Sequence, residues 1–197
     1  MIDRRAVAIA GHTGDVATAE AGLANAAGDV RATALGALER LGRLDDDRLR
    51  AAFDDPDPAV RRRAVTIAAH HRDVVLLGPL GDTDPSVVEA AAWASGEHER
   101  VGDDELAALV TLAGGAPDPL VREAAVAALG AIGDDRGLEA ILAATGDRPA
   151  IRRRAVLALA PFVAPDHERA AEVAAALARA AGDHDWQVRQ AAEDVTA

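Results

Sequence analysis

Two dipeptides join a histidine to a glutamate, and both residue types bind metal ions. They are His98-Glu99 and His167-Glu168. A two-metal site needs ligands that converge from several helices, whereas both dipeptides fall in segments that we predict to be turns. Helix capping or solvation is therefore the simpler interpretation of both histidines. We predict neither a metal nor any other cofactor.

Other reactive groups are few. His70 and His71 are neighbours that diverge by about 100° on a helix, so they cannot bind one ligand together. They lie where we predict a helix to end, and there a histidine complements the negative end of the helix dipole. The arginine triplets at 61–63 and 152–154 are candidate phosphate or carboxylate contacts, but consecutive helix residues point in three directions. The segment "GHTGD" at 11–15 lacks the lysine of a phosphate loop, and we predict no catalytic residue.

The composition narrows the possible function classes. The 197 residues contain no cysteine, lysine or tyrosine, which excludes disulfides, thiolate nucleophiles and lysine Schiff bases. The formal net charge of −12 argues against nucleic-acid binding, because phosphates attract a concentrated positive surface. No window has the length and apolarity of a signal peptide or a membrane span, so we expect a soluble cytoplasmic protein. Alanine dominates the apolar half of the chain, which favours helix.

One sequence register repeats seven times. When Val60 of "DPAVRRRAV" is taken as position zero, similar segments follow along the whole chain. Position +4 is alanine in all seven segments, and position +1 is arginine in five of them. Apolar residues at 0, +4, +7 and +8 predict one buried stripe of an α-helix. The anchors at position zero are Ile2, Val30, Val60, Val87, Val121, Ile151 and Val188.

Each repeat predicts a pair of helices, named here the A helix and the B helix. An Asp-Pro step often precedes the A helix, where it breaks the chain and fixes the entry. A turn with Gly or Asp follows, and acidic residues then begin the apolar B helix, where they cap free N–H groups. Such pairs bury their apolar faces only when stacked. The last repeat has no B helix.

This pattern resembles HEAT repeats, in particular the short type first noted in phycobilisome lyases. The segments that carry the resemblance are "DDPDPAVRRRAV", "APDPLVREAAVAALGAIGDDRGLEAIL" and "GDHDWQVRQAAEDV". The resemblance covers the whole chain and implies an all-α, right-handed α-solenoid of about seven helix pairs, the last half-complete. It further implies an outer layer of A helices and a concave inner layer of B helices. We predict one domain over residues 1–197.

The resemblance also implies structural residues. In HEAT repeats of this type an aspartate six residues before the arginine ties neighbouring repeats together. That spacing occurs at Asp55 with Arg61 and at Asp183 with Arg189. Elsewhere the aspartate or the arginine is replaced, so we expect an interrupted series. The residues assigned to this structural role are Asp55, Arg61, Arg122, Arg152 and Asp183.

The enzyme activities known in HEAT-like proteins do not fit this sequence well. Deoxyhypusine hydroxylases hold two irons with His-Glu dipeptides on successive A helices and need four such pairs, whereas this chain has two. DNA glycosylases of this type need a basic groove with aromatic residues, and the sequence is acidic with 2% aromatics. Bilin lyase activity would rest on resemblance alone.

Departures from the register indicate where function lies. Trp93 stands off the apolar stripe at +6, beside the polar turn of residues 97–100. Trp186 stands where other repeats carry proline, and Gly78-Pro79 predicts a kinked B helix. Acidic starts of B helices, including Asp166, form a candidate ridge for a basic protein segment. The candidate binding residues are Trp93, Glu97, His98, Glu99, Arg100, Trp186 and Arg189.

The sequence thus favours a non-catalytic scaffold that binds a protein partner along its concave face or terminal edge. We expect a monomer or weak dimer. The alternative is an enzyme or enzyme accessory, of the lyase or hydroxylase type, that binds a metal or a small anionic ligand.

Overall fold

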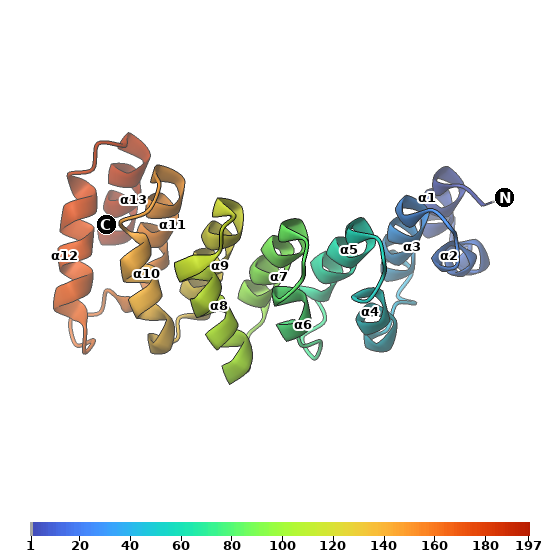
Figure 1. Ribbon diagram of the computed structural model, residues 1–197, viewed down its shortest axis with the longest axis horizontal. Coiled ribbons are helices and arrows are strands. Elements are labelled where there is room, and N and C mark those ends of the chain that lie inside the picture. Colours follow the sequence, from blue (N-terminus) through green and yellow to red (C-terminus); the bar gives the residue numbers. More distant parts are fainter. Residues whose placement is uncertain (1) are drawn as a thin grey trace. The chain divides into compact units, whose positions relative to one another are not determined.

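Successive A and B helices make up the chain in the computed structural model, which describes residues 2–197 (Figure 1). This described part holds thirteen α-helices, two short 3-10 helices and no strand. The predicted all-α repeat architecture is confirmed. The A helices are α1 (Arg4–Thr13), α3 (Gly28–Arg40), α5 (Pro58–Ala68), α7 (Pro85–Glu97), α9 (Pro119–Ile132), α11 (Pro149–Ala158) and α13 (Trp186–Thr196). The B helices are α2 (Val16–Leu23), α4 (Asp46–Ala52), α6 (Leu77–Leu80), α8 (Asp103–Gly115), α10 (Leu138–Ala144) and α12 (Ala170–Ala181).

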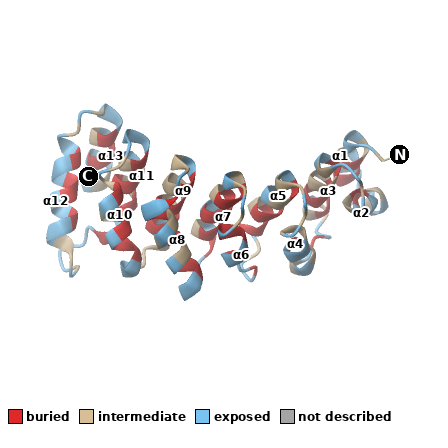
Figure 2. Cartoon of the chain, in the orientation of Figure 1, coloured by how far each residue is buried: buried red, intermediate tan, exposed pale blue. Residues whose placement is uncertain are grey.

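The register positions form the core. All anchors from Val30 onward lie inside A helices and are buried, and the alanines at +4 in the same six repeats are almost completely buried. A methyl group at +4 lets the neighbouring helix approach closely, which a larger side chain would prevent. The B helices also have one buried side. Figure 2 shows this clearly on α12, where buried residues lie along one side and exposed residues along the other.

Aspartate caps fix the starts of several A helices. The carboxylate of Asp57 accepts a hydrogen bond from the Ala59 N–H, and Pro58 occupies the first turn of α5. Asp118 caps α9 in the same way, and Asp185 caps α13 without a following proline. The cap satisfies an N–H group that the helix itself leaves free, so the sequence determines where these three A helices begin.

The chain divides into two compact units, residues 1–94 and 95–197. In the first unit α3 packs against α1, α2 and α5, and α4 packs against α5. In the second unit α9 packs against α8, α10 and α11, and α13 packs against α11 and α12. The prediction that residues 1–197 form one domain, with the B helices on a concave face, stays a prediction.

Two B helices differ from the prediction. The segment around Gly78-Pro79 does not form a long kinked helix, because α6 is a single turn in which Pro79 is buried. Proline lacks an N–H group and therefore suits the first turn of a helix, so its place in a one-turn helix costs no internal hydrogen bond. The helix predicted to start at Asp166 starts at Ala170 instead, after a turn that contains His167.

Candidate functional site

Arginines at position +1 form ion pairs with aspartates of the following repeat. Arg61 donates from Nε to Asp82 Oδ2 (2.7 Å) and from Nη2 to Asp82 Oδ1 (2.8 Å). Its Nη1 donates to the backbone carbonyl of Asp55 (2.9 Å), so one guanidinium joins its own entry loop to the next one. We call the four equivalent pairs the Arg–Asp ladder. They are Arg31–Asp55, Arg61–Asp82, Arg122–Asp147 and Arg152–Asp183.

The series links neighbouring repeats and is interrupted, as expected, but each arginine forms its ion pair with an aspartate of the following repeat and not with the residue six positions before it. The residue six positions before the arginine supplies a backbone carbonyl in most repeats, whereas the carboxylate comes from the next repeat. The carboxylate of Asp55 therefore binds Arg31 and not Arg61, and the carboxylate of Asp183 binds Arg152 and not Arg189. Arg189 donates to the carbonyls of Asp183 and His184.

One register step lacks both partners at once. Val88 stands at the arginine position of its repeat, and Ala116 stands at the aspartate position of the next repeat. Both side chains are buried. Because neither a lone arginine nor a lone aspartate is left, the loss creates no unpaired charge. The ladder is interrupted at this step, but apolar residues replace both members of the pair, so the interruption leaves no buried charge.

The ladder lowers the pKa of its own four carboxylates. Hydrogen bonds from the partner arginines hold the pKa of Asp55, Asp82, Asp147 and Asp183 below the ordinary value, although partial burial opposes this. Each carboxylate also accepts a backbone N–H from its own loop. These are stable ion pairs with every oxygen engaged, which is the chemistry of a structural link and not of an acid–base catalyst.

His71 has a structural position between two repeats. Its Nδ1 lies 2.8 Å from Asp46 Oδ1 and its Nε2 lies 3.1 Å from Glu39 Oε2. Burial lowers the pKa of His71, but the hydrogen bonds to Asp46 and Glu39 outweigh burial and raise it above the ordinary value. The neighbouring His70 is exposed.

The acidic starts of B helices are partly neutralised. Arg136 binds both Asp103 (2.9 Å) and Asp134 (2.8 Å), and its hydrogen bonds lower the pKa of Asp134 to about 2. Asp135 lies 3.0 Å from the Nε2 of His167. Basic groups from neighbouring segments thus pair with part of the acidic B-helix starts, and the ridge for a basic protein segment stays a prediction.

The His-Glu dipeptides have separate structural roles. His98 is buried, so the expectation of a solvated contact residue is wrong for its side chain. Glu97, Glu99 and Arg100 are exposed. His167 is half-buried, packs edge to face against Phe162 and accepts a hydrogen bond from the Arg169 N–H at Nδ1. Among residues 2–197, no group of three or more His, Cys, Asp or Glu side chains is arranged to hold a metal ion.

Both tryptophans are exposed, but their surroundings differ. Trp93 is 43% exposed on α7 and belongs to the first unit, whereas Glu97–Arg100 belong to the second. Trp186 is 65% exposed at the first residue of α13. It borders a groove of about 240 Å³, which we call the Trp186 groove. The groove is lined by Arg153, Leu157, Trp186, Gln187, Gln190, Ala191 and Asp194.

Most of the groove residues were not singled out from the sequence, although the register contains a signal for them. Arg153 and Gln190 stand at +2 of their repeats, and Leu157 and Asp194 stand at +6. Trp93 also stands at +6. Arg153 and Leu157 lie on α11, and Gln190 and Asp194 lie on α13, so the Trp186 groove is formed between these two A helices. Positions +2 and +6 are the places where a repeat varies without loss of the core.

Comparisons with known proteins identify the repeat and the fold. Residues 75–160 match the family model described as HEAT repeats. A designed armadillo repeat protein in complex with peptide (KR)4 shares 15% identity with a TM-score of 0.53, over 98% of this chain and 85% of that chain. An engineered protein shares 20% identity with a TM-score of 0.50, over 98% and 82%. Computationally designed armadillo repeat proteins for modular peptide recognition share 17% identity with a TM-score of 0.51, over 98% and 85%.

The other comparisons were negative. No curated protein matches the sequence. Across the described residues, every helix is too short or too polar to cross a lipid bilayer.

Proposed function

We propose that this HEAT-repeat protein is a non-catalytic scaffold that binds a basic, extended segment of a protein partner. The observation that carries the proposal is the Trp186 groove. Because 65% of Trp186 is exposed, this large side chain contributes little to the core. Tryptophan is, in contrast, the residue type most enriched among strong contacts at protein interfaces.

The groove has the size and chemistry of a side-chain pocket. Its volume of about 240 Å³ lies below the range of roughly 300–1,000 Å³ that is typical of small-molecule sites. Trp186 offers an aromatic face, Asp194 a carboxylate and Gln187 an amide. A lysine or arginine side chain from a partner would stack on the indole and reach the carboxylate. Arg153, on the opposite wall of the groove, can donate hydrogen bonds to a backbone carbonyl of the partner or to an acidic residue next to the bound basic side chain.

The charge of the second unit favours a basic partner. Residues 95–197 contain eighteen Asp and Glu residues against ten arginines. Such an imbalance raises the rate at which a positively charged segment encounters the surface. The designed armadillo protein that shares the helical-repeat fold was solved with the basic peptide (KR)4. That likeness concerns the fold alone, and it supports the proposal only by showing that stacked helix pairs present room for an extended basic chain.

A peptide-display selection tests the proposal. A library of random 12-residue peptides is selected against the full chain, and the enriched peptides are then measured against purified variants. We expect enrichment of Lys- and Arg-containing peptides that quench tryptophan fluorescence on binding. Trp186→Ala should weaken them by at least about tenfold, the loss of one well-packed interface aromatic.

The chain supplies its own control for this test. Trp93→Ala removes an exposed tryptophan of the other unit, so it should leave the selected peptides bound with unchanged affinity. If no peptide is enriched, or if the enriched peptides bind Trp186→Ala as well as the wild type, the groove is not the contact site. The expected cytoplasmic location and monomeric or weakly dimeric state belong to the same proposal.

A further inference from the structure

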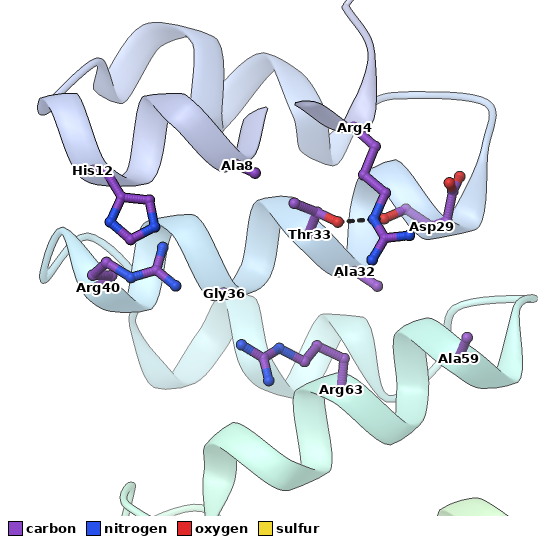
Figure 3. Close-up of a pocket in the computed structure, with 10 residues that line it drawn as sticks. All are labelled: Arg4, Ala8, His12, Asp29, Ala32, Thr33, Gly36, Arg40, Ala59 and Arg63. Atoms are coloured by element: carbon purple, nitrogen blue, oxygen red, sulfur yellow. Dashed lines mark hydrogen bonds between the residues drawn. The ribbon is translucent and has the colours of Figure 1, made fainter. Parts of the chain in front are cut away.

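A second pocket, on the A helices of the first unit, is positively charged. It has a volume of about 430 Å³ and lies between α1, α3 and α5 (Figure 3). Arg4 and His12 come to it from α1, Arg40 from α3 and Arg63 from α5. Figure 3 shows His12 beside Arg40, and Arg63 extended toward Gly36. We call this the basic pocket. The three guanidinium groups reach it from three different repeats.

The arginines of the basic pocket differ from those of the ladder in their contacts. In residues 2–197, Arg4, Arg40 and Arg63 make no hydrogen bond and no ion pair, in contrast to the arginines of the ladder. Asp29 is the one carboxylate among the described residues that line the pocket. With His12 neutral, three arginines and one aspartate give the pocket a formal charge of +2. A local excess of positive charge in a chain of net charge −12 is unexpected for a solvated face.

Gly36 makes room for one of these guanidinium groups. A Cβ atom at this position would collide with the Arg63 guanidinium, whose Cζ would lie only 3.2 Å away. Gly36 stands at +6, where the other A helices carry a side chain. Glycine inside a helix costs stability, because it has more conformational freedom to lose than alanine. Its use here seats Arg63 against the α3 backbone and directs the charge into the pocket.

We propose that the basic pocket binds a phosphate monoester in its doubly charged form. Guanidinium groups donate paired N–H bonds that match phosphate oxygens, and three of them from three helices surround one anion better than a single helix can. The volume leaves space for an organic group beside the phosphate. The Asp29 carboxylate is then available to accept a hydrogen bond from a hydroxyl or amine of that group. This site is separate from the Trp186 groove and does not depend on the scaffold proposal.

Titration calorimetry at constant ionic strength tests this assignment. The probes are inorganic phosphate, adenosine 5′-monophosphate and a phosphoserine peptide with its unphosphorylated form. Arg63→Gln and Arg4→Gln should each weaken binding about tenfold, as expected for loss of one charge-assisted pair. Arg62→Gln and Arg5→Gln are matched controls, because they remove the same charge from the same helices outside the pocket. The controls should change affinity less than about twofold.

Gly36→Ala provides a test without any change of charge. The three atoms nearest to the added methyl group all belong to the flexible Arg63 side chain, which can move aside while α3 and α5 keep their positions. We expect Gly36→Ala to bind phosphate esters several-fold more weakly while its melting temperature stays the same or rises. A merely structural role of Gly36 would instead lower the melting temperature.

The outcomes separate clearly. Tighter binding of the nucleotide identifies a free phosphorylated small molecule as the ligand, and tighter binding of the phosphoserine peptide identifies a phosphorylated partner. The proposal is overturned if every probe binds more weakly than about 10 mM, which is the affinity of a nonspecific ion. It is equally overturned if Arg62→Gln weakens binding as much as Arg63→Gln. Trp186→Ala should leave all these affinities unchanged, because Trp186 does not line the basic pocket. The phosphate proposal and the scaffold proposal can therefore fail separately.

Discussion

Arg61 and Asp82 face each other through two parallel hydrogen bonds of 2.7 and 2.8 Å, with only 14% and 10% of their side chains exposed. The same arginine donates to the carbonyl of Asp55 in its own entry loop. Two loops that precede successive A helices are therefore joined by one rigid, planar group. The ladder thus fixes the spacing of repeats at their loops, while the +4 alanines fix it in the core.

Removal of one partner from this pair should destabilise the protein. Arg61→Met leaves the Asp82 carboxylate largely buried with no counter-charge, and the four hydrogen bonds of the Arg61 guanidinium are lost. We expect the free energy of unfolding to fall by about 2–3 kcal/mol, within the range for loss of a partner from a mostly buried ion pair. Urea denaturation followed by circular dichroism measures the change.

The chain offers a control in its own register. Arg61→Val combined with Asp82→Ala reproduces the residue types found at Val88 and Ala116, and it leaves no charge unpaired. The double variant should recover at least half of the stability lost in Arg61→Met, because the desolvated carboxylate is gone. Equal stability of the double variant and Arg61→Met would show that the ladder acts through something other than charge pairing.

The ladder should also make the protein sensitive to acid. Hydrogen bonds from arginine lower the pKa of the four ladder aspartates, so their contribution to stability is present above the unfolded value of about 3.9 and is lost as pH falls through the lower folded pKa. The contribution of the ladder to stability should be nearly constant between about pH 7 and 5 and should decline below about pH 4. In Arg61→Met the decline should be shallower, since the pKa of Asp82 is no longer lowered. Denaturation curves at several pH values decide this.

His71 should have the opposite pH dependence. Its pKa is raised in the folded state, because hydrogen bonds to Asp46 and Glu39 outweigh the effect of burial. Its contribution is therefore fully present below the unfolded value of about 6.5 and is lost as pH rises through the folded pKa. Wild type should lose more stability between pH 6 and 8.5 than His71→Gln does. His70→Gln is the matched control and should behave like wild type, and NMR titration of the ring protons gives the pKa of His71 directly.

The A helices could be predicted from the sequence because register and capping agree. Val121 at position zero, Ala125 at +4 and the Asp118-Pro119 start all point to the same helix, and the structure has it. The B helices could be predicted less well. Nothing in the sequence between His71 and Gly81 shows that one turn, Leu77–Leu80, is enough to cover the apolar face there. That outcome depends on packing against neighbours, which local propensity does not contain.

The sequence spacing alone could not show that each arginine binds the aspartate of the following repeat. A distance of six residues from Asp55 to Arg61 is equally consistent with a contact inside one repeat and with a contact between repeats. The stagger of neighbouring repeats decides between the two. The basic pocket had a faint signal, since position +10 is basic in the first three repeats, at His12, Arg40 and His70. The sequence does not show that Arg4 and Arg63, from different repeats, line the same pocket as Arg40, so its positive charge could not be predicted.

A second glycine tests how closely the A helices of the other unit approach. A Cβ atom on Gly130 of α9 would collide with both the Cβ and the Cα of Ala158 in α11, and backbone cannot move aside as a guanidinium can. Gly130→Ala should therefore force the two helices apart and lower the free energy of unfolding by about 1–3 kcal/mol, as overpacking does in other cores. Gly114→Ala on α8 is the control, because its added methyl group meets no atom within 4 Å. That variant should be more stable by about 0.5 kcal/mol, the ordinary gain when alanine replaces an exposed helical glycine. A Gly130→Ala protein as stable as the control would mean that α9 and α11 pack less closely than the +4 alanines imply.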